Sequence, residues 1–182
     1  MVFQELFFYL QLRYFRIKIE QPEFSVNLNR FNLNEKAKKM LQIVEKNKKH
    51  IPDLQRIFLE VRQKTFYWLD TQNYNLTDFD SETEGEFILV AVFNDEVVGF
   101  ISLWLPDNFI HHFYIDETYQ HHKIGTKLLK EAIQIMNTPI KLKCLEKNII
   151  AIDFYKKKGF IPIDKGVSNH GEYILFALQK KD

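Results

Sequence analysis

The pattern of apolar and polar positions is most informative between Phe109 and Met136. Residues 109–115 are aromatic or β-branched apart from two histidines, which predicts a strand. A polar stretch extends to Lys123, and the apolar residues that follow recur at helical spacing, at Ile124, Leu128, Leu129, Ala132, Ile133 and Met136. A strand that passes through a tight loop into a helix directs several backbone N–H groups at one point. This stretch therefore predicts an anion site, most often one for phosphate.

Similar patterns predict the rest of a domain that begins near Met40. Strands are expected over residues 41–44, 86–93, 97–105, 140–145, 160–163 and 172–179, and helices over 51–66 and 148–158. The first of these helices has a buried stripe formed by Leu54, Ile57, Phe58 and Val61. Asn148 is expected to cap the second helix, and Gly159 to end it. This order predicts an α+β fold in which helices flank a mixed, mostly antiparallel sheet.

Residues 67–86 combine aromatic and acidic side chains without a steady period. We expect a short helix followed by a mobile acidic loop. A solvated surface segment is the preferred interpretation. The alternative is a wall beside the substrate, where Asp78, Asp80 and Glu82 would attract an amine.

Residues 1–39 are expected to be an N-terminal extension of the domain formed by residues 40–182. One helical face of this extension would carry Phe3, Leu6, Phe7, Leu10 and Tyr14. Packing on its own domain or on a second copy in a homodimer is favoured over membrane-surface binding, because the polar face is not strongly basic. A secretory signal peptide is not expected, since the segment lacks a basic start and a small-residue cleavage site.

Composition narrows the classes of partner. The chain has 25 Lys and Arg residues against 24 Asp and Glu, a formal net charge of +1, so a nucleic-acid partner is not expected. No stretch approaches the roughly 18 to 20 apolar residues of a spanning helix, so no transmembrane segment is expected. A single cysteine, Cys144, excludes an intrachain disulfide and fits a cytoplasmic protein.

Two motifs resemble those of the GNAT superfamily of N-acetyltransferases, and the resemblance covers about residues 40–182. The family pairs a strand end with Arg/Gln-x-x-Gly-x-Gly/Ala, and here the strand end Phe113-Tyr114-Ile115 precedes Gln120-His121-His122-Lys123-Ile124-Gly125. The family's second motif is Asn-x-x-Ala-x-x-Phe-Tyr-x-x-x-Gly-Phe, and every specified position is matched in this chain by Asn148, Ala151, Phe154, Tyr155, Gly159 and Phe160. Both motifs in the correct order are a strong signal.

The resemblance implies a GNAT-like acyl-CoA N-acyltransferase fold and direct transfer of an acetyl group from acetyl-CoA to a primary amine on a small molecule or peptide. It implies that the cofactor-binding residues are Phe113, Tyr114, Ile115, Gln120, His121, His122, Lys123, Ile124, Gly125, Thr126, Asn148 and Tyr155. Lys123 departs from the family's glycine; it gives up the freedom to adopt positive φ and adds a charged donor near the phosphates. The alternative is a GNAT-fold module that binds CoA or a protein partner without catalysis.

The resemblance also implies catalytic roles. Tyr155 matches the family's proton donor to the leaving thiolate, and its alternative role is that of a buried aromatic. His111 and His112 are the candidate bases, with a hydrogen-bonded surface histidine as the equal alternative for each. Strand alternation predicts that His111 shares a face with Phe113, while His112 points to the opposite face. A metal site is disfavoured, because neighbouring histidines on a strand point apart and no carboxylate or cysteine pattern joins them.

Overall fold

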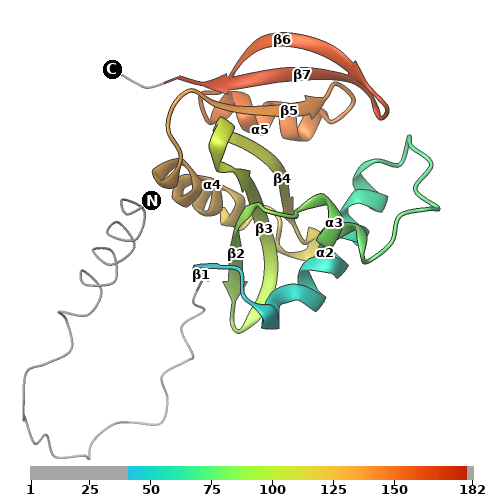
Figure 1. Ribbon diagram of the computed structural model, residues 1–182, viewed down its shortest axis with the longest axis vertical. Coiled ribbons are helices and arrows are strands. Elements are labelled where there is room, and N and C mark those ends of the chain that lie inside the picture. Colours follow the sequence, from blue (N-terminus) through green and yellow to red (C-terminus); the bar gives the residue numbers. More distant parts are fainter. Residues whose placement is uncertain (1–40, 180–182) are drawn as a thin grey trace, which may run out of the picture. The chain divides into compact units, whose positions relative to one another are not determined.

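The computed structural model describes residues 41–179, so the predicted extension, its apolar helical face and its boundary lie outside the described residues. The described residues form one seven-stranded sheet (Figure 1). Its spatial order is β1 (Leu41–Glu45), β2 (Phe87–Phe93), β3 (Glu96–Trp104), β4 (Phe109–Ile115), β5 (Ile140–Leu145), β7 (Gly171–Leu178) and β6 (Ile161–Ser168).

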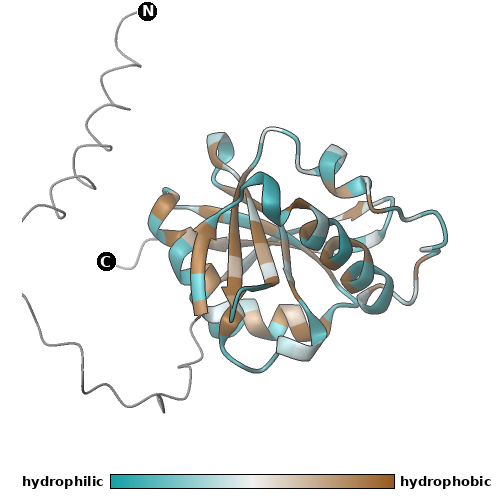
Figure 2. Ribbon diagram, turned by 90° about the horizontal axis from the view of Figure 1, so that it is seen from below, coloured by the Kyte–Doolittle hydropathy of each residue, from teal (hydrophilic) through white to brown (hydrophobic). Residues whose placement is uncertain are grey.

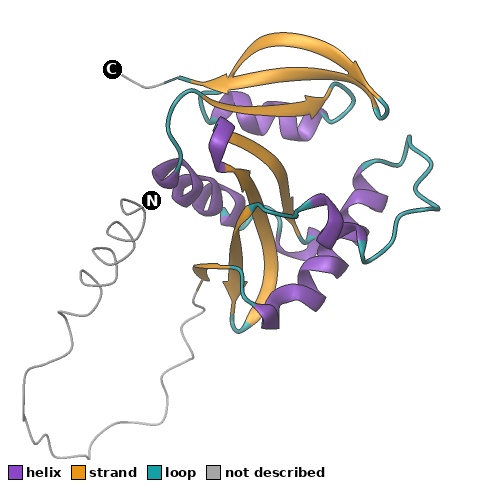
Figure 3. Ribbon diagram, in the orientation of Figure 1, coloured by secondary structure: helices purple, strands orange, loops and turns teal. Residues whose placement is uncertain are grey.

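The sheet is antiparallel except at its centre, where β4 and β5 run parallel. Their pairing is confined to Phe109 with Lys141 and Ile110 with Leu142, after which the two strands separate. Figure 3 shows the consequence, with β5, β6 and β7 turned away from β2, β3 and β4. The predicted α+β fold with a mixed, mostly antiparallel sheet is confirmed.

Four α-helices among the described residues cover the two faces of the sheet. The α4/α5 face carries α4 (Ile124–Ile135) and α5 (Ile149–Lys157), and the α2/α3 face carries α2 (Ile51–Thr65) and α3 (Asp78–Glu82). The strands are largely hydrophobic, whereas the helices mix hydrophobic and hydrophilic residues (Figure 2). Each helix therefore has an apolar side to bury and a polar side for water.

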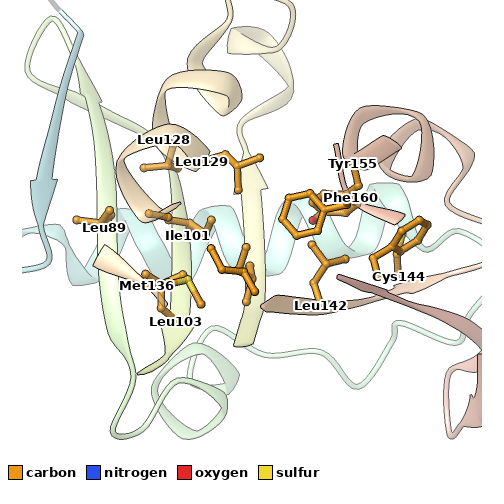
Figure 4. Close-up of a cluster of buried hydrophobic side chains, with 14 of the residues drawn as sticks. Leu89, Ile101, Leu103, Leu128, Leu129, Met136, Leu142, Cys144, Tyr155 and Phe160 are labelled. Carbon is orange, nitrogen blue, oxygen red and sulfur yellow. The ribbon is translucent and has the colours of Figure 1, made fainter. Parts of the chain in front are cut away.

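The core on the α4/α5 face joins the apolar stripe of α4 to the strands beneath it. Leu128 and Leu129 of α4 are essentially fully buried against residues such as Leu89 and Ile101 (Figure 4). Tyr155 belongs to the same cluster, so α5 covers the same face of the sheet as α4. This core fixes the start of α4 against the end of β4.

The core on the α2/α3 face contains most of the stripe predicted for α2. Leu54, Ile57 and Phe58 are fully buried there against Phe79 of α3, and only Val61 is half-buried. Pro52 lies in the first turn of this helix, where its missing N–H costs no hydrogen bond.

The acidic residues of 67–86 do not form the predicted loop. Turns come first, and Asp78 and Glu82 then lie in the short helix α3. The guanidinium of Arg62 pairs with both carboxylates at 2.7 Å and stacks between the rings of Phe58 and Tyr74, with its central carbon 3.8 and 4.3 Å from their centroids. Charge pairing orders this segment, and a single turn of helix is too short to show a period in the sequence.

Strand β6 extends to Ser168, five residues beyond its predicted end at Ile163. It is an edge strand of the sheet and pairs only with β7. Most of its residues are therefore exposed, and its sequence shows no alternation of apolar and polar residues. Gly166 lies against the ring of Tyr173, and a Cβ added there would meet the Tyr173 Oη at 2.5 Å. A larger residue at this position would therefore require the Tyr173 ring to move.

Candidate active site

A cavity of about 420 Å³ opens where β4 separates from β5, between β4, α4, α5 and the end of α2. We call it the main cavity because most of the predicted cofactor-binding residues line it. Eleven of the twelve residues predicted to bind the cofactor line it: Phe113, Tyr114, Ile115, Gln120, His121, Lys123, Ile124, Gly125, Thr126, Asn148 and Tyr155. His122 is not part of this lining. Residues that the prediction missed include Val61, the last residue of the apolar stripe of α2, and Thr65, which lies one helical turn beyond it.

The start of α4 directs uncapped backbone donors at this cavity. The first helical bond is donated by the Lys127 N–H to the Lys123 carbonyl at 3.1 Å, so the N–H groups of Ile124, Gly125 and Thr126 precede the helical ladder. The N-cap residue Lys123 makes no side-chain capping bond, and no acidic residue lies in the first turn. These donors and the helix dipole form an anion cradle.

The loop before α4 holds left-handed backbone conformations without glycine. Lys123 has φ 62°, and His121 has φ 65°. Each costs roughly 1 to 2 kcal/mol relative to a right-handed conformation. Lys123 therefore keeps the backbone shape for which the family uses glycine.

Gly125 lies in the first turn of α4, beside the end of β4. A Cβ at this position would lie 3.4 Å from Phe113 Cζ and 3.6 Å from Ile115 Cγ1, which is ordinary van der Waals contact. The backbone donors of α4 therefore lie close to the end of the strand, and the position has room for a Cβ.

The end of β4 offers backbone groups to an extended ligand. Asp116 donates its N–H to the Val98 carbonyl at 2.9 Å, so alternation along the strand turns the groups of Phe113 and Ile115 away from β3. These two residues lie beyond the part of β4 that pairs with β5. Their N–H and C=O groups can therefore pair with an amide chain as an added strand would.

Tyr155 stands at the inner end of the cavity and is only 8% exposed. Its ring packs among Phe113, Phe154, Phe160 and Phe176, with centroid separations of 5.6 to 6.5 Å. Burial raises the pKa of Tyr155 above its ordinary value. The phenol therefore stays protonated and can donate a hydrogen bond at neutral pH.

Asn148 takes the N-cap position of α5, as the sequence predicts. Its Oδ1 accepts the Ala151 N–H at 3.2 Å. The side-chain amide nitrogen remains a donor beside the cavity, so capping and ligand binding are compatible in one residue.

His111 and His112 do not point to opposite faces, and that prediction is wrong. In the pairing of β3 with β4, Ser102 faces His112 while Leu103 faces Ile110, so His111 is an extra residue in a β-bulge. The bulge interrupts the two-residue period, and the two imidazole centroids lie 6.1 Å apart. Both rings line a second hollow, which also begins where β4 separates from β5 and is completed by Trp104, Asp107, Phe109 and Lys143.

His112 is held as a neutral, buried ring. Its Nε2 lies 3.3 Å from the Glu82 carbonyl, and its ring packs on Phe58 and Tyr114. Burial lowers the pKa of His112 to about 4. A base that weak is ill-suited to take a proton from an amine near neutral pH.

His111 has a different environment. Its side chain is 41% exposed, and its Nδ1 pairs with Oε1 of Glu86, whose own side chain is 3% exposed. Burial raises the pKa of Glu86, against the lowering influence of His111. Glu86 Oε2 is buried without a hydrogen-bond partner in the described part of the chain, which typically costs roughly 1 to 3 kcal/mol.

Residues 41–179 contain no group of three or more His, Cys, Asp and Glu side chains placed to hold a metal ion. The described helices are all too short or too polar to cross a membrane.

Comparison with known proteins gives a family and a fold. The family model described as acetyltransferase (GNAT) family matches residues 51–160. A search of curated proteins finds no significant match.

Several solved structures are similar. Apo-form YjaB from Escherichia coli is 21% identical, with 76% of this chain and 97% of that chain covered and a TM-score of 0.63. The PaiA N-acetyltransferase from Thermoplasma acidophilum, in complex with coenzyme A, is 20% identical, with 76% and 99% covered and a TM-score of 0.63. A GNAT-family acetyltransferase from Staphylococcus aureus is 24% identical, with 77% and 100% covered and a TM-score of 0.60. These likenesses support the fold.

Proposed function

The chain belongs to the GNAT acetyltransferase family, and on that premise we propose that it transfers an acetyl group from acetyl-CoA to a primary amine. One observation carries the proposal. The cavity brings the uncapped start of α4 together with the unpaired end of β4, so one space offers an anion cradle and an edge for an amide chain. Acetyl-CoA has a pyrophosphate and a pantetheine arm built from amides, which match these two features.

The residues of the cavity fit this ligand along its length. The N–H groups of Ile124, Gly125 and Thr126 would hold the pyrophosphate, with the charge of Lys123 beside them. The backbone of Phe113 would pair with the pantetheine arm, and the Asn148 amide would donate to it.

The same residues support direct transfer. The thioester supplies the activated acetyl group when the cosubstrate is bound. A backbone N–H at the end of β4 would polarise its carbonyl oxygen. The phenol of Tyr155 would donate a hydrogen bond to the sulfur as the carbon–sulfur bond breaks, because burial keeps this group protonated.

The amine must lose a proton as it is acetylated, and His111 is the better candidate to accept it. Its ring is 41% exposed and pairs with a carboxylate, whereas burial lowers the pKa of His112 to about 4. The two histidines thus have different roles, a base at His111 and a packed aromatic at His112.

Thioester consumption with a panel of primary amines tests the proposal. The protein should consume acetyl-CoA, and Tyr155→Phe should lower kcat by about 100-fold, the lower end of the range for loss of a proton donor, while the KM for acetyl-CoA stays unchanged. Tyr67→Phe is the matched control, since Tyr67 is 81% exposed. Stabilisation by CoA without turnover of any amine would instead indicate a binding module.

A further inference from the structure

A strip of buried polar groups crosses the α2/α3 face of the sheet. Two side-chain oxygens in the described residues are buried without a partner, and they belong to Glu86 and Ser102. Ser102 of β3 pairs with His112 of β4 on one side and with Ile88 of β2 on the other. Ile88 comes two residues after Glu86 in the sequence. The strip therefore leads from the start of β2 to the two histidines of β4. Natural proteins rarely keep such groups in an apolar setting without a use for them.

Glu86 is the buried end of this strip. Its side chain is 3% exposed, and one carboxylate oxygen pairs with Nδ1 of His111 while the other has no partner in the described part of the chain. A carboxylate that accepts a hydrogen bond from the Nδ1–H group of an imidazole fixes both the tautomer and the orientation of the ring. The second nitrogen, Nε2, is then the one without a proton.

The two histidines of β4 differ in whether their Nε2 atom is already engaged in a hydrogen bond. His112 uses its Nε2 at the Glu82 carbonyl, whereas the His111 ring is 41% exposed and borders the hollow formed with Trp104 and Phe109. With Nδ1 held by Glu86, the Nε2 of His111 makes no hydrogen bond within residues 41–179 and can act in that hollow.

Charged groups from each neighbouring element surround the pair. Lys46, which follows β1, acts on Glu86 and opposes the effect of burial on its pKa. Asp107 from the turn before β4 and Lys143 from β5 line the hollow together with both histidines. The two lysines and the two carboxylates balance in formal charge, so the hydrogen bond between His111 and Glu86 is the specific interaction that selects the tautomer of the ring.

We propose that Glu86 is a positioning residue, whose buried carboxylate holds His111 through Nδ1 so that Nε2 takes the proton of the acceptor amine. The inference rests on the proposed acetyl transfer. In that step the amine nitrogen bonds to the acetyl carbon, and the carbon–sulfur bond breaks. CoA leaves as its thiolate, which accepts the hydrogen bond of Tyr155, and the nitrogen's proton moves to Nε2 of His111. The resulting imidazolium is paired with the Glu86 carboxylate until it releases the proton to water.

A double-mutant cycle on kcat tests this role. Glu86→Gln keeps the shape of the side chain and removes its charge, so it should lower kcat about tenfold without changing the KM for acetyl-CoA. His111→Gln should lower kcat by a larger factor, and adding Glu86→Gln to it should cause no further loss. Glu84→Gln is the matched control, because Glu84 is exposed two residues away, and its kcat should be unchanged.

A structural role of Glu86 would give a different result. If Glu86→Gln lowers kcat by the same factor with and without His111, or leaves kcat unchanged, the positioning role is wrong. Glu86→Leu provides a second variant. The loss of kcat that it causes, measured per folded molecule, should likewise disappear when His111→Gln is already present. A wild-type protein that binds CoA but acetylates no amine would overturn the proposed function and this inference together, whereas normal turnover by Glu86→Gln would overturn only the inference.

Discussion

The two faces of the sheet use different chemistry. On the α4/α5 face, the cavity is built from backbone donors and aromatic rings, and its buried residues are apolar apart from the hydroxyl of Tyr155 and the thiol of Cys144. On the α2/α3 face, the apolar core contains Arg62, and Glu86 and His112 lie beside it, each held by a specific partner. Main-chain recognition depends on local conformation, whereas a buried charge depends on residues distant in sequence.

This difference predicts different responses to mutation. A change in the anion cradle should alter ligand affinity and leave the folding free energy nearly intact, because the cradle is made of groups that helix formation leaves free. A change in the buried charges should alter stability, because each removed partner leaves another charge uncompensated.

Arg62→Ala should destabilise the fold by about 3 to 5 kcal/mol, the range for breaking a buried ion pair. The substitution removes both pairings, with Asp78 and Glu82, from a guanidinium that is 7% exposed. Urea unfolding measures the loss. Arg56→Ala is the matched control and should cost under about 1 kcal/mol, because that side chain is 39% exposed.

The same variant tests whether the two faces of the sheet are energetically independent. The affinity of folded Arg62→Ala for CoA should remain that of the wild type, since Arg62 does not line the main cavity. A large loss of affinity would show that the two faces are energetically coupled. If Arg56→Ala destabilised the fold as much as Arg62→Ala, burial of the Arg62 ion pairs would not explain the loss of stability.

His112 should make stability fall in mild acid. Its pKa is about 4 in the fold against about 6.5 in an unfolded chain, so the unfolded state binds the extra proton first. Its contribution is complete above about pH 6.5 and is lost as pH falls toward 4, by up to about 3 kcal/mol.

His112→Phe should flatten this dependence, since phenylalanine suits the contacts with Phe58 and Tyr114 and does not titrate. Urea unfolding at several pH values between 4 and 7 provides the comparison. The pKa values of Asp78 and Asp116 are lowered by their hydrogen bonds and by arginine despite partial burial, so their contributions are lost at a more acidic pH. An unchanged slope in His112→Phe would refute the assignment of this window to His112.

Gly125→Asp should weaken CoA binding by about 100-fold, or about 2.7 kcal/mol. The added carboxylate would compete with the pyrophosphate for the same backbone donors. An acidic residue in the first turn favours the helix, so the unfolding free energy should not fall for electrostatic reasons.

Calorimetric titration with CoA measures this effect. Lys130→Ala is the matched control, because it changes the net charge by the same amount from an exposed position farther along α4. If both variants lost affinity equally, general charge would explain the result and the anion cradle would not.

Much of the α4/α5 face could be predicted from sequence, because its parts are contiguous. The strand, loop and helix from Phe109 onward, and the cap at Asn148, follow local periods and capping rules. The face of His111 could not be predicted, because a one-residue bulge reverses the alternation that the prediction assumed. The partners Arg62 with Glu82, and His111 with Glu86, are separated by 20 and 25 residues, and only the folded sheet brings them together.

Lys123→Gly should change stability and CoA affinity least, and it tests whether the backbone alone forms the anion cradle. Glycine accepts the left-handed conformation of this residue, so the unfolding free energy should rise by about 1 kcal/mol. The affinity for CoA should stay within about threefold, since the backbone donors remain.

Lys130→Gly provides the opposite control, because glycine inside a helix should lower stability by about 1 kcal/mol. Thermal unfolding of both variants tests the signs. A large loss of CoA affinity in Lys123→Gly would show that the lysine ammonium contributes to binding, and that the main chain alone does not form the cradle.

A crystal structure of the protein in complex with CoA would show whether the main cavity holds the cosubstrate. We expect pyrophosphate oxygens to accept hydrogen bonds from the N–H groups of Ile124 to Thr126, and the pantetheine arm to lie along Phe113 to Ile115. Arg62 should keep its partners on the other face. A CoA molecule bound on the α2/α3 face, or a pyrophosphate away from the start of α4, would show that the anion cradle is assigned to the wrong place.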